Sequence, residues 1–137
     1  MRFYDKGRSS GASLLPNAPT LSKPRILRAL EASLAGLACA LKTEQAFRLE
    51  ALVLAAALPA SFALTPDFSR RAELIAVLLA VLAVELLNTS IEKLCDRTTP
   101  QIDPVIKAVK DMGSAAVFCA LCMAGVVWIG AALARWA

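Results

Sequence analysis

Four polar side chains recur every three or four residues within an otherwise apolar segment: Glu85, Asn88, Glu92 and Asp96. On a helix this spacing places all four within one stripe about 80° wide. The residues before them, 74–84, are apolar enough to belong to a membrane-spanning helix. A carboxylate at that depth costs roughly 2.5–3.5 kcal/mol or more, so Glu85 indicates a function. The alternative, a buried ion-pair seam, lacks an obvious basic partner within the apolar segments.

Two shorter polar clusters flank this stripe in the sequence. One is the Glu44–Glu50 segment, and the other is the Lys110–Ser114 segment. Each alone is typical of a helix end at a membrane surface, but all three clusters fall on the same side of their spans. Carboxylates there can hold Mg²⁺, while a lysine and backbone N–H groups can hold phosphates. Glu85 lies about 10 Å deeper than Glu92 by helical rise, which suits a reaction between a nucleotide and a lipid head group.

The composition predicts an all-α membrane protein that can position these clusters. The 137 residues are 58% hydrophobic and only 6% aromatic, with a mean hydropathy of +0.60. The apolar residues are mainly Ala, Leu and Val, which favour helices over β-sheet. We therefore expect one integral membrane domain over residues 23–137.

Three membrane spans are predicted, over about 46–66, 70–95 and 108–134. The third is clearest, because residues 112–134 carry no charge and would extend about 35 Å. The first is weakest, because its uncharged stretch is short and contains Pro59. Two spans plus an interfacial helix is the alternative.

The N-terminal region divides into two parts. Residues 1–22 are rich in Ser, Gly, Pro and Asn and lack periodicity, which predicts a mobile tail and not a signal peptide. Residues 23–42 alternate leucines with basic residues at helical spacing, which predicts an amphipathic interfacial helix. Most of the 15 lysines and arginines precede the first predicted span or lie between the second and third. By the positive-inside rule, the N-terminus is cytoplasmic.

Several kinds of chemistry are excluded by what the sequence lacks. It contains no His, so neither an imidazole base nor a Ser-His or Cys-His nucleophile can form. It also lacks the glycine-rich loops that commonly hold nucleotide phosphates. Cys119 and Cys122 form a lone C-x-x-C pair, which favours apolar packing over metal binding.

The residue pattern resembles the prokaryotic diacylglycerol kinases, a family of small membrane lipid kinases. The resemblance is carried by Glu85-Leu-Leu-Asn-Thr-Ser-Ile-Glu92, by Lys110-Asp-Met-Gly-Ser114 and by Glu44-Gln-Ala-Phe-Arg-Leu-Glu50. It implies three transmembrane helices and a surface helix in a homotrimer with sites between subunits, in the bacterial inner membrane. It also implies transfer of the ATP γ-phosphoryl group to diacylglycerol with Mg²⁺, which gives phosphatidic acid. No nucleic-acid partner is expected.

The resemblance also implies a role for individual residues. Glu85 would be the general base, and Asn88 would sit between that base and the metal. Glu44 and Glu92 would hold Mg²⁺. Further residues would contact ATP: Arg25, Glu44, Glu92, Asp96, Lys110 and Asp111. Others, with Glu85, would line the lipid substrate pocket: Ser33, Phe47, Arg48, Ser114 and Trp128.

Two alternative functions remain open. A related branch of the family phosphorylates undecaprenol, although the Gly113-Ser114 pair favours the diacylglycerol type. A small proton-coupled transporter could also contain one intramembrane Glu. That function would explain Glu85 but not the group formed by Glu44, Glu92 and Lys110.

Overall fold

The computed structural model describes residues 24–98 and 103–136, where four helices contain nearly every residue and no strand forms. The helices are α1 (Arg25–Thr43), α2 (Gln45–Leu64), α3 (Phe68–Thr98) and α4 (Pro104–Trp136). Their bounds lie close to those of the four predicted segments. The tail predicted for residues 1–22 lies outside the described residues. The chain divides into two units, Met1–Leu34 and Ala35–Ala137, which are described separately below.

Three of the helices, α2, α3 and α4, are each long and apolar enough to cross a membrane. The prediction of an all-α chain with three such helices is thereby confirmed. α2 qualifies although Pro59 lies inside it. All five leucines of α1 are exposed, and the position of this helix at a membrane surface remains a prediction.

Aspartate side chains cap the N-termini of the two longer helices, α3 and α4. Asp67 accepts hydrogen bonds from the backbone N–H groups of Ser69 and Arg70 at 3.1 and 3.3 Å, at the start of α3. Asp103 accepts from Val105 at 2.7 Å, at the start of α4. Such caps satisfy N–H groups that have no partner within the helix. Two polar turns thus fix where the long helices begin.

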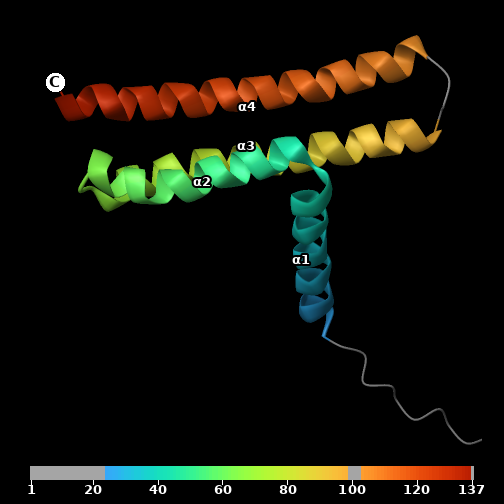
Figure 1. Ribbon diagram of the computed structural model, residues 1–137, viewed down its shortest axis with the longest axis horizontal. Helices are drawn as coiled ribbons and strands as arrows, with labels where there is room; N and C mark the ends of the chain where they lie inside the picture. The colour runs from blue at the N-terminus through green and yellow to red at the C-terminus, as the bar shows by residue number, and fades with distance from the viewer. Residues whose placement is uncertain (1–23, 99–102, 137) are drawn as a thin grey trace, which may run out of the picture. The chain divides into compact units, whose positions relative to one another are not determined.

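α3 is the central helix of the second unit. It packs along α4 and, less extensively, along α2, whereas α2 and α4 contact each other little. In Figure 1 these three helices lie lengthwise beside one another, with successive helices running in opposite directions. A residue on the buried face of α3 is therefore enclosed by its neighbours.

Small residues on α4 allow it to approach α3 closely. Val77 and Val81 of α3 form a buried cluster with Ala120 and Ala124 of α4. Close approach through small side chains is how helices associate in lipid, where burying apolar surface provides little driving force. The Trp128 Nε1–H of α4 also donates a 3.1 Å hydrogen bond to the Leu74 carbonyl of α3. These contacts fix α4 against α3.

The buried face of α3 changes from apolar to polar along a single stripe. Leu74, Val77 and Val81 are buried, and Glu85 and Asn88 continue the same face at the next helical turns. The packing that encloses the apolar residues therefore encloses the polar ones too. This continuity connects the fold to the candidate site.

We predict that Leu74→Ala will lower the free energy of unfolding by about 2 kcal/mol. Leu74 is 0% exposed, so truncation leaves a cavity. This cost lies at the lower end for such changes, because a leucine released into lipid loses little transfer energy. Unfolding in mixed micelles measures the effect.

Leu79→Ala is the matched control, because Leu79 lies on the same helix and is 52% exposed. It should change stability by less than about 0.5 kcal/mol. Equal losses for the two variants would contradict the assigned buried face of α3.

Candidate functional site

Glu85 and Asn88 are buried polar residues at the centre of the candidate site. They are 7% and 8% exposed, respectively. The Asn88 Nδ2 group donates a 3.2 Å hydrogen bond to Glu92 Oε1, one turn further along α3. Asn88 Oδ1 is buried and has no hydrogen-bond partner among the described residues. Because an unsatisfied buried oxygen is costly, Asn88 is a candidate for contact with a ligand.

The backbone of α4 passes directly against Asn88 at Gly113. A methyl group added at position 113 would overlap the Asn88 Oδ1 atom. A side chain at position 113 would therefore require the Asn88 side chain to move. The sequence indicated Gly113 only as part of a motif near a helix start, and its contact with Asn88 follows from the pairing of α3 with α4.

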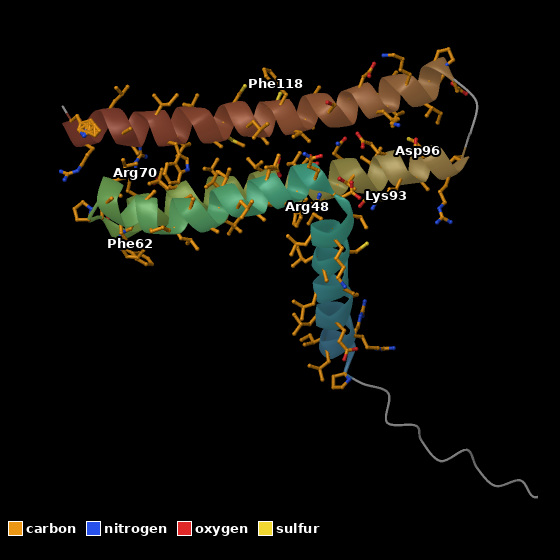
Figure 2. The ribbon with its side chains drawn as sticks, viewed as in Figure 1. Arg48, Phe62, Arg70, Lys93, Asp96 and Phe118 are labelled. Atoms are coloured by element: carbon orange, nitrogen blue, oxygen red, sulfur yellow. The ribbon has the colours of Figure 1, made fainter. Side chains whose placement is uncertain are left out.

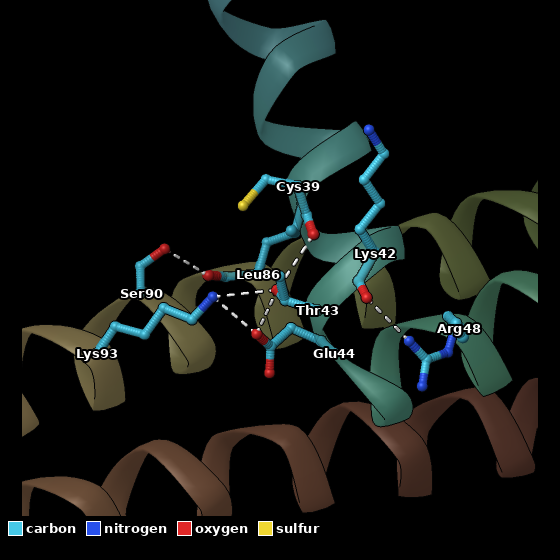
Figure 3. A network of polar contacts seen from close by, with 8 residues as sticks. All are labelled: Cys39, Lys42, Thr43, Glu44, Arg48, Leu86, Ser90 and Lys93. Atoms are coloured by element: carbon cyan, nitrogen blue, oxygen red, sulfur yellow. Dashed lines mark hydrogen bonds and ion pairs between the residues drawn. The ribbon is translucent and has the colours of Figure 1, made fainter.

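Glu44 and Lys93 connect the start of α2 to α3 (Figure 3). The Lys93 Nζ atom lies 2.7 Å from Glu44 Oε1 and 3.3 Å from Thr43 Oγ1. Thr43 Oγ1 in turn lies 2.6 Å from Glu44 Oε1. Hydrogen bonds from Lys93 and then from Thr43 hold the pKa of the Glu44 carboxyl below its ordinary value. Glu44 is thus held as a charged carboxylate, and Lys93 is a site residue that had no predicted role.

A second lysine, Lys110 of α4, forms an ion pair with α3. Lys110 Nζ lies 2.9 Å from Asp96 Oδ1, so the structure brings together two residues predicted to contact ATP. Asp111, another residue predicted to contact ATP, pairs instead with Lys107 on the exposed surface of α4, at 2.6 Å. Figure 2 shows Lys93 and Asp96 at the same end of α3.

Glu50 is another site residue that sequence reasoning missed. It belongs to the motif before the first span but had no predicted role. Its Oε2 atom is buried without a partner among the residues described, and its carboxyl group is close enough to Glu85 to interact electrostatically. The only sequence signal was its spacing from Phe47, which also faces inward. Two carboxyl groups, from α2 and α3, therefore share one buried region.

Four other predicted substrate residues lie in different surroundings. Phe47 is 3% exposed and packs inside the helices. Arg48 donates to the Lys42 carbonyl at 3.2 Å, and Ser114 is exposed. Trp128 borders an apolar groove of about 400 Å³ with Val53, Leu78 and Ala124.

Trp128 is separated from the carboxylates along the helix axis. Its indole contacts the Leu74 carbonyl, which lies roughly 16 Å from Glu85 by helical rise. The structure therefore does not bring this tryptophan to the carboxylates. Arg25 and Ser33 belong to the first unit, where Ser33 Oγ donates to the Ala29 carbonyl at 3.0 Å.

Taken together, the polar residues form one site along α3, in which exposed charged pairs at one end give way to buried polar side chains further along the helix. Charged pairs, Glu44–Lys93 and Lys110–Asp96, lie towards its C-terminal end. Glu92 and Asn88 follow, and Glu85 is deepest along the helix. Cations at one level can bind phosphate groups, and a buried carboxylate at another can accept a proton. The arrangement can therefore bind one polar, phosphate-bearing reactant and one more apolar reactant that reaches the buried carboxylate.

Comparison with known proteins identifies the family of the chain. The family model for prokaryotic diacylglycerol kinase matches residues 31–131. A diacylglycerol kinase of Pseudomonas aeruginosa is 45% identical over 104 residues, covering 76% of this chain and 85% of that protein. One of Haemophilus influenzae is 36% identical over 111 residues, covering 81% and 94%. One of Escherichia coli K12 is 36% identical over 104 residues, covering 76% and 85%. The chain therefore belongs to the prokaryotic diacylglycerol kinase family.

Proposed function

We propose that this protein transfers the γ-phosphoryl group of ATP to the hydroxyl group of diacylglycerol, which produces phosphatidic acid. The observation that carries the proposal is the burial of Glu85 and Asn88 on the same face of α3 as its apolar core residues. A carboxylate at that depth can meet a lipid hydroxyl. Membership of the family and three helices suited to membrane spanning support the same function.

In this proposal the lipid hydroxyl loses its proton to Glu85 as its oxygen bonds to the γ-phosphorus. The bond between that phosphorus and the oxygen bridging to the β-phosphate breaks, and ADP leaves. No covalent enzyme intermediate is needed, because such transfers depend mainly on positioning and charge neutralisation. Asn88 orients Glu92 through their hydrogen bond. Lys110, which is paired with Asp96, would contact the phosphates.

The residues present fit a magnesium ion that arrives with ATP. Mg²⁺ is usually held by one or two carboxylates together with substrate phosphates, not by a cage of protein ligands. Residues 24–98 and 103–136 contain no group of three His, Cys, Asp or Glu residues that could hold a metal. Glu92 and Glu44 would hold the ion, and the Asn88 Oδ1 atom is a buried oxygen in need of a partner. When bound, Mg²⁺ would neutralise the phosphate charge.

We further propose that the protein lies in the bacterial inner membrane with its N-terminus in the cytoplasm, where ATP is available. The distribution of lysine and arginine supports this orientation. The family resemblance also implies a homotrimer, in which neighbouring subunits would enclose the site.

The function is tested by giving purified protein in micelles ATP, Mg²⁺ and either diacylglycerol or undecaprenol. We expect phosphatidic acid as the main product and little phosphorylated undecaprenol. Omission of Mg²⁺ should abolish turnover. Preference for undecaprenol would place the protein in the related branch of the family that phosphorylates undecaprenol. Proton-driven transport without lipid phosphorylation would indicate a transporter.

We predict that Glu85→Gln will lower kcat by about 10²- to 10⁴-fold, because a general base contributes on that order. ATP affinity should change little, since the charged pairs near the nucleotide remain. Steady-state kinetics with a nucleotide-binding assay measure both.

Glu73→Gln is the control for this change, because Glu73 is an exposed glutamate near the start of α3. It should retain full turnover. Near-normal activity of Glu85→Gln would refute the assignment of the base.

We also predict that Gly113→Ala will lower kcat by about 10- to 100-fold, because small displacements at a reacting centre have effects of that size. The added methyl group would displace the Asn88 side chain and so disturb Glu92. The measurement is kcat together with the KM for ATP.

Gly125→Ala on the same helix is the matched control, because a methyl group there meets no atom within 4 Å. This variant should behave as wild type. If both variants keep wild-type kcat, Asn88 does not depend on the space at Gly113.

A further inference from the structure

A polar pocket lies at the end of the second unit away from the carboxylate site. It has a volume of about 230 Å³ and is formed where α2 ends, α3 begins and α4 ends. Its lining includes Leu64, Thr65, Pro66, Arg70, Ala131 and Arg135. Figure 2 shows Arg70 and Phe62 at this end, far along the helices from Lys93 and Asp96. Neither the family resemblance nor the proposed reaction uses this pocket.

Three arginines gather at this end of the helices. Arg70, Arg71 and Arg135 are the basic residues that follow the first predicted span or the third, and no lysine joins them. Arg70 pairs with Glu73 at 2.7 Å through Nη1. Arg135 forms no hydrogen bond or ion pair with any residue that the structure describes, so its guanidinium is free to bind an anion.

Arg71 holds one wall of the pocket in place. Its Nη2 atom donates a 2.7 Å hydrogen bond to the Pro66 carbonyl, and its guanidinium lies 4.4 Å from the centre of the Phe62 ring. Asp67, the nearest carboxylate in the turn, is engaged in capping α3. The turn is thus fixed by its own contacts, which leaves Arg135 to face a ligand. Arg70 also lines the pocket, although its Nη1 atom is paired with Glu73.

The surroundings of the pocket place it at the level of lipid head groups. Phe62, Phe68 and Trp136 are exposed around this end, and exposed aromatic residues are typical of the membrane–water interface. The volume is smaller than the roughly 300–1,000 Å³ of pockets for drug-sized ligands, so a nucleotide would not fit. The phosphate group of a phospholipid, with part of the attached glycerol, is of suitable size.

We propose that this pocket binds the phosphate group of an anionic phospholipid in the leaflet opposite the carboxylate site. A guanidinium group can donate two parallel hydrogen bonds to a phosphate group. Basic pockets between membrane helices bind anionic head groups. Arg70 belongs to α3 and Arg135 to α4, so a bound phosphate would join the two helix ends.

The test uses the full chain, purified in neutral detergent and mixed with phosphatidylglycerol or phosphatidylcholine. Native mass spectrometry measures the lipid that stays bound. We expect about tenfold tighter binding of phosphatidylglycerol, which corresponds to about 1.4 kcal/mol. Arg135→Gln should reduce this preference, and Arg70→Gln with Arg135→Gln should abolish it.

Arg97→Gln is the control, because Arg97 lies in the last turn of α3 at the opposite end. It should keep the wild-type preference. Arg70→Lys with Arg135→Lys tests the paired geometry and should retain only part of it. Kinase turnover checks that each variant is folded, because the proposed reaction uses no residue of this pocket.

Three results would overturn the proposal. Equal binding of the two lipids by the wild type would show that the pocket does not select anionic lipid. Loss of preference in Arg97→Gln would show a general charge effect. Displacement of the lipid by millimolar inorganic phosphate would show a site for free phosphate instead.

Discussion

The close packing of α4 against α3 is the interaction on which the rest of the structure depends. Ala120 and Ala124 allow α4 to approach Val77 and Val81, and the absence of a side chain at Gly113 allows the same approach beside Asn88. One continuous contact therefore encloses an apolar core and a polar site. Because lipid provides little hydrophobic driving force, this fit has to come from small residues and complementary shape.

This packing explains how a carboxylate can be kept within an apolar helix. Glu85 occupies the position in the stripe where another core residue would be expected, and its neighbours on the same face are Val81 and Asn88. The cations stay nearer the helix ends, where Lys93 pairs with Glu44 and Lys110 with Asp96. Water-soluble and lipid reactants can therefore approach one site from different depths, which is the physical requirement of a membrane lipid kinase.

Local periodicity made part of this architecture predictable. The stripe of Glu85, Asn88 and Glu92 follows from helical spacing alone, and the helix bounds follow from hydropathy and from turn residues such as Asp67 and Asp103. Contacts between helices were not predictable in that way. The pairing of Glu44 with Lys93 depends on how α2 meets α3, and no local signal encodes it.

Tertiary packing also determines which side chains lie near Glu85. The Trp128 indole contacts Leu74, several helical turns from Glu85, and its expected contact with the lipid substrate stays a prediction. Glu50 had been given no role, yet its carboxyl group lies within electrostatic range of Glu85. Both outcomes follow from the register of α2 and α4 against α3, which sequence spacing on a single helix does not determine.

The most direct test of the central claim is whether diacylglycerol shields Glu85. A hydrophobic carbodiimide reaches carboxyl groups from the bilayer and forms stable adducts, which peptide mass spectrometry can assign to single residues. The account predicts that Glu85 is labelled, that diacylglycerol slows its labelling and that ATP alone does not. Labelling of Glu85 at the same rate with and without diacylglycerol would contradict it.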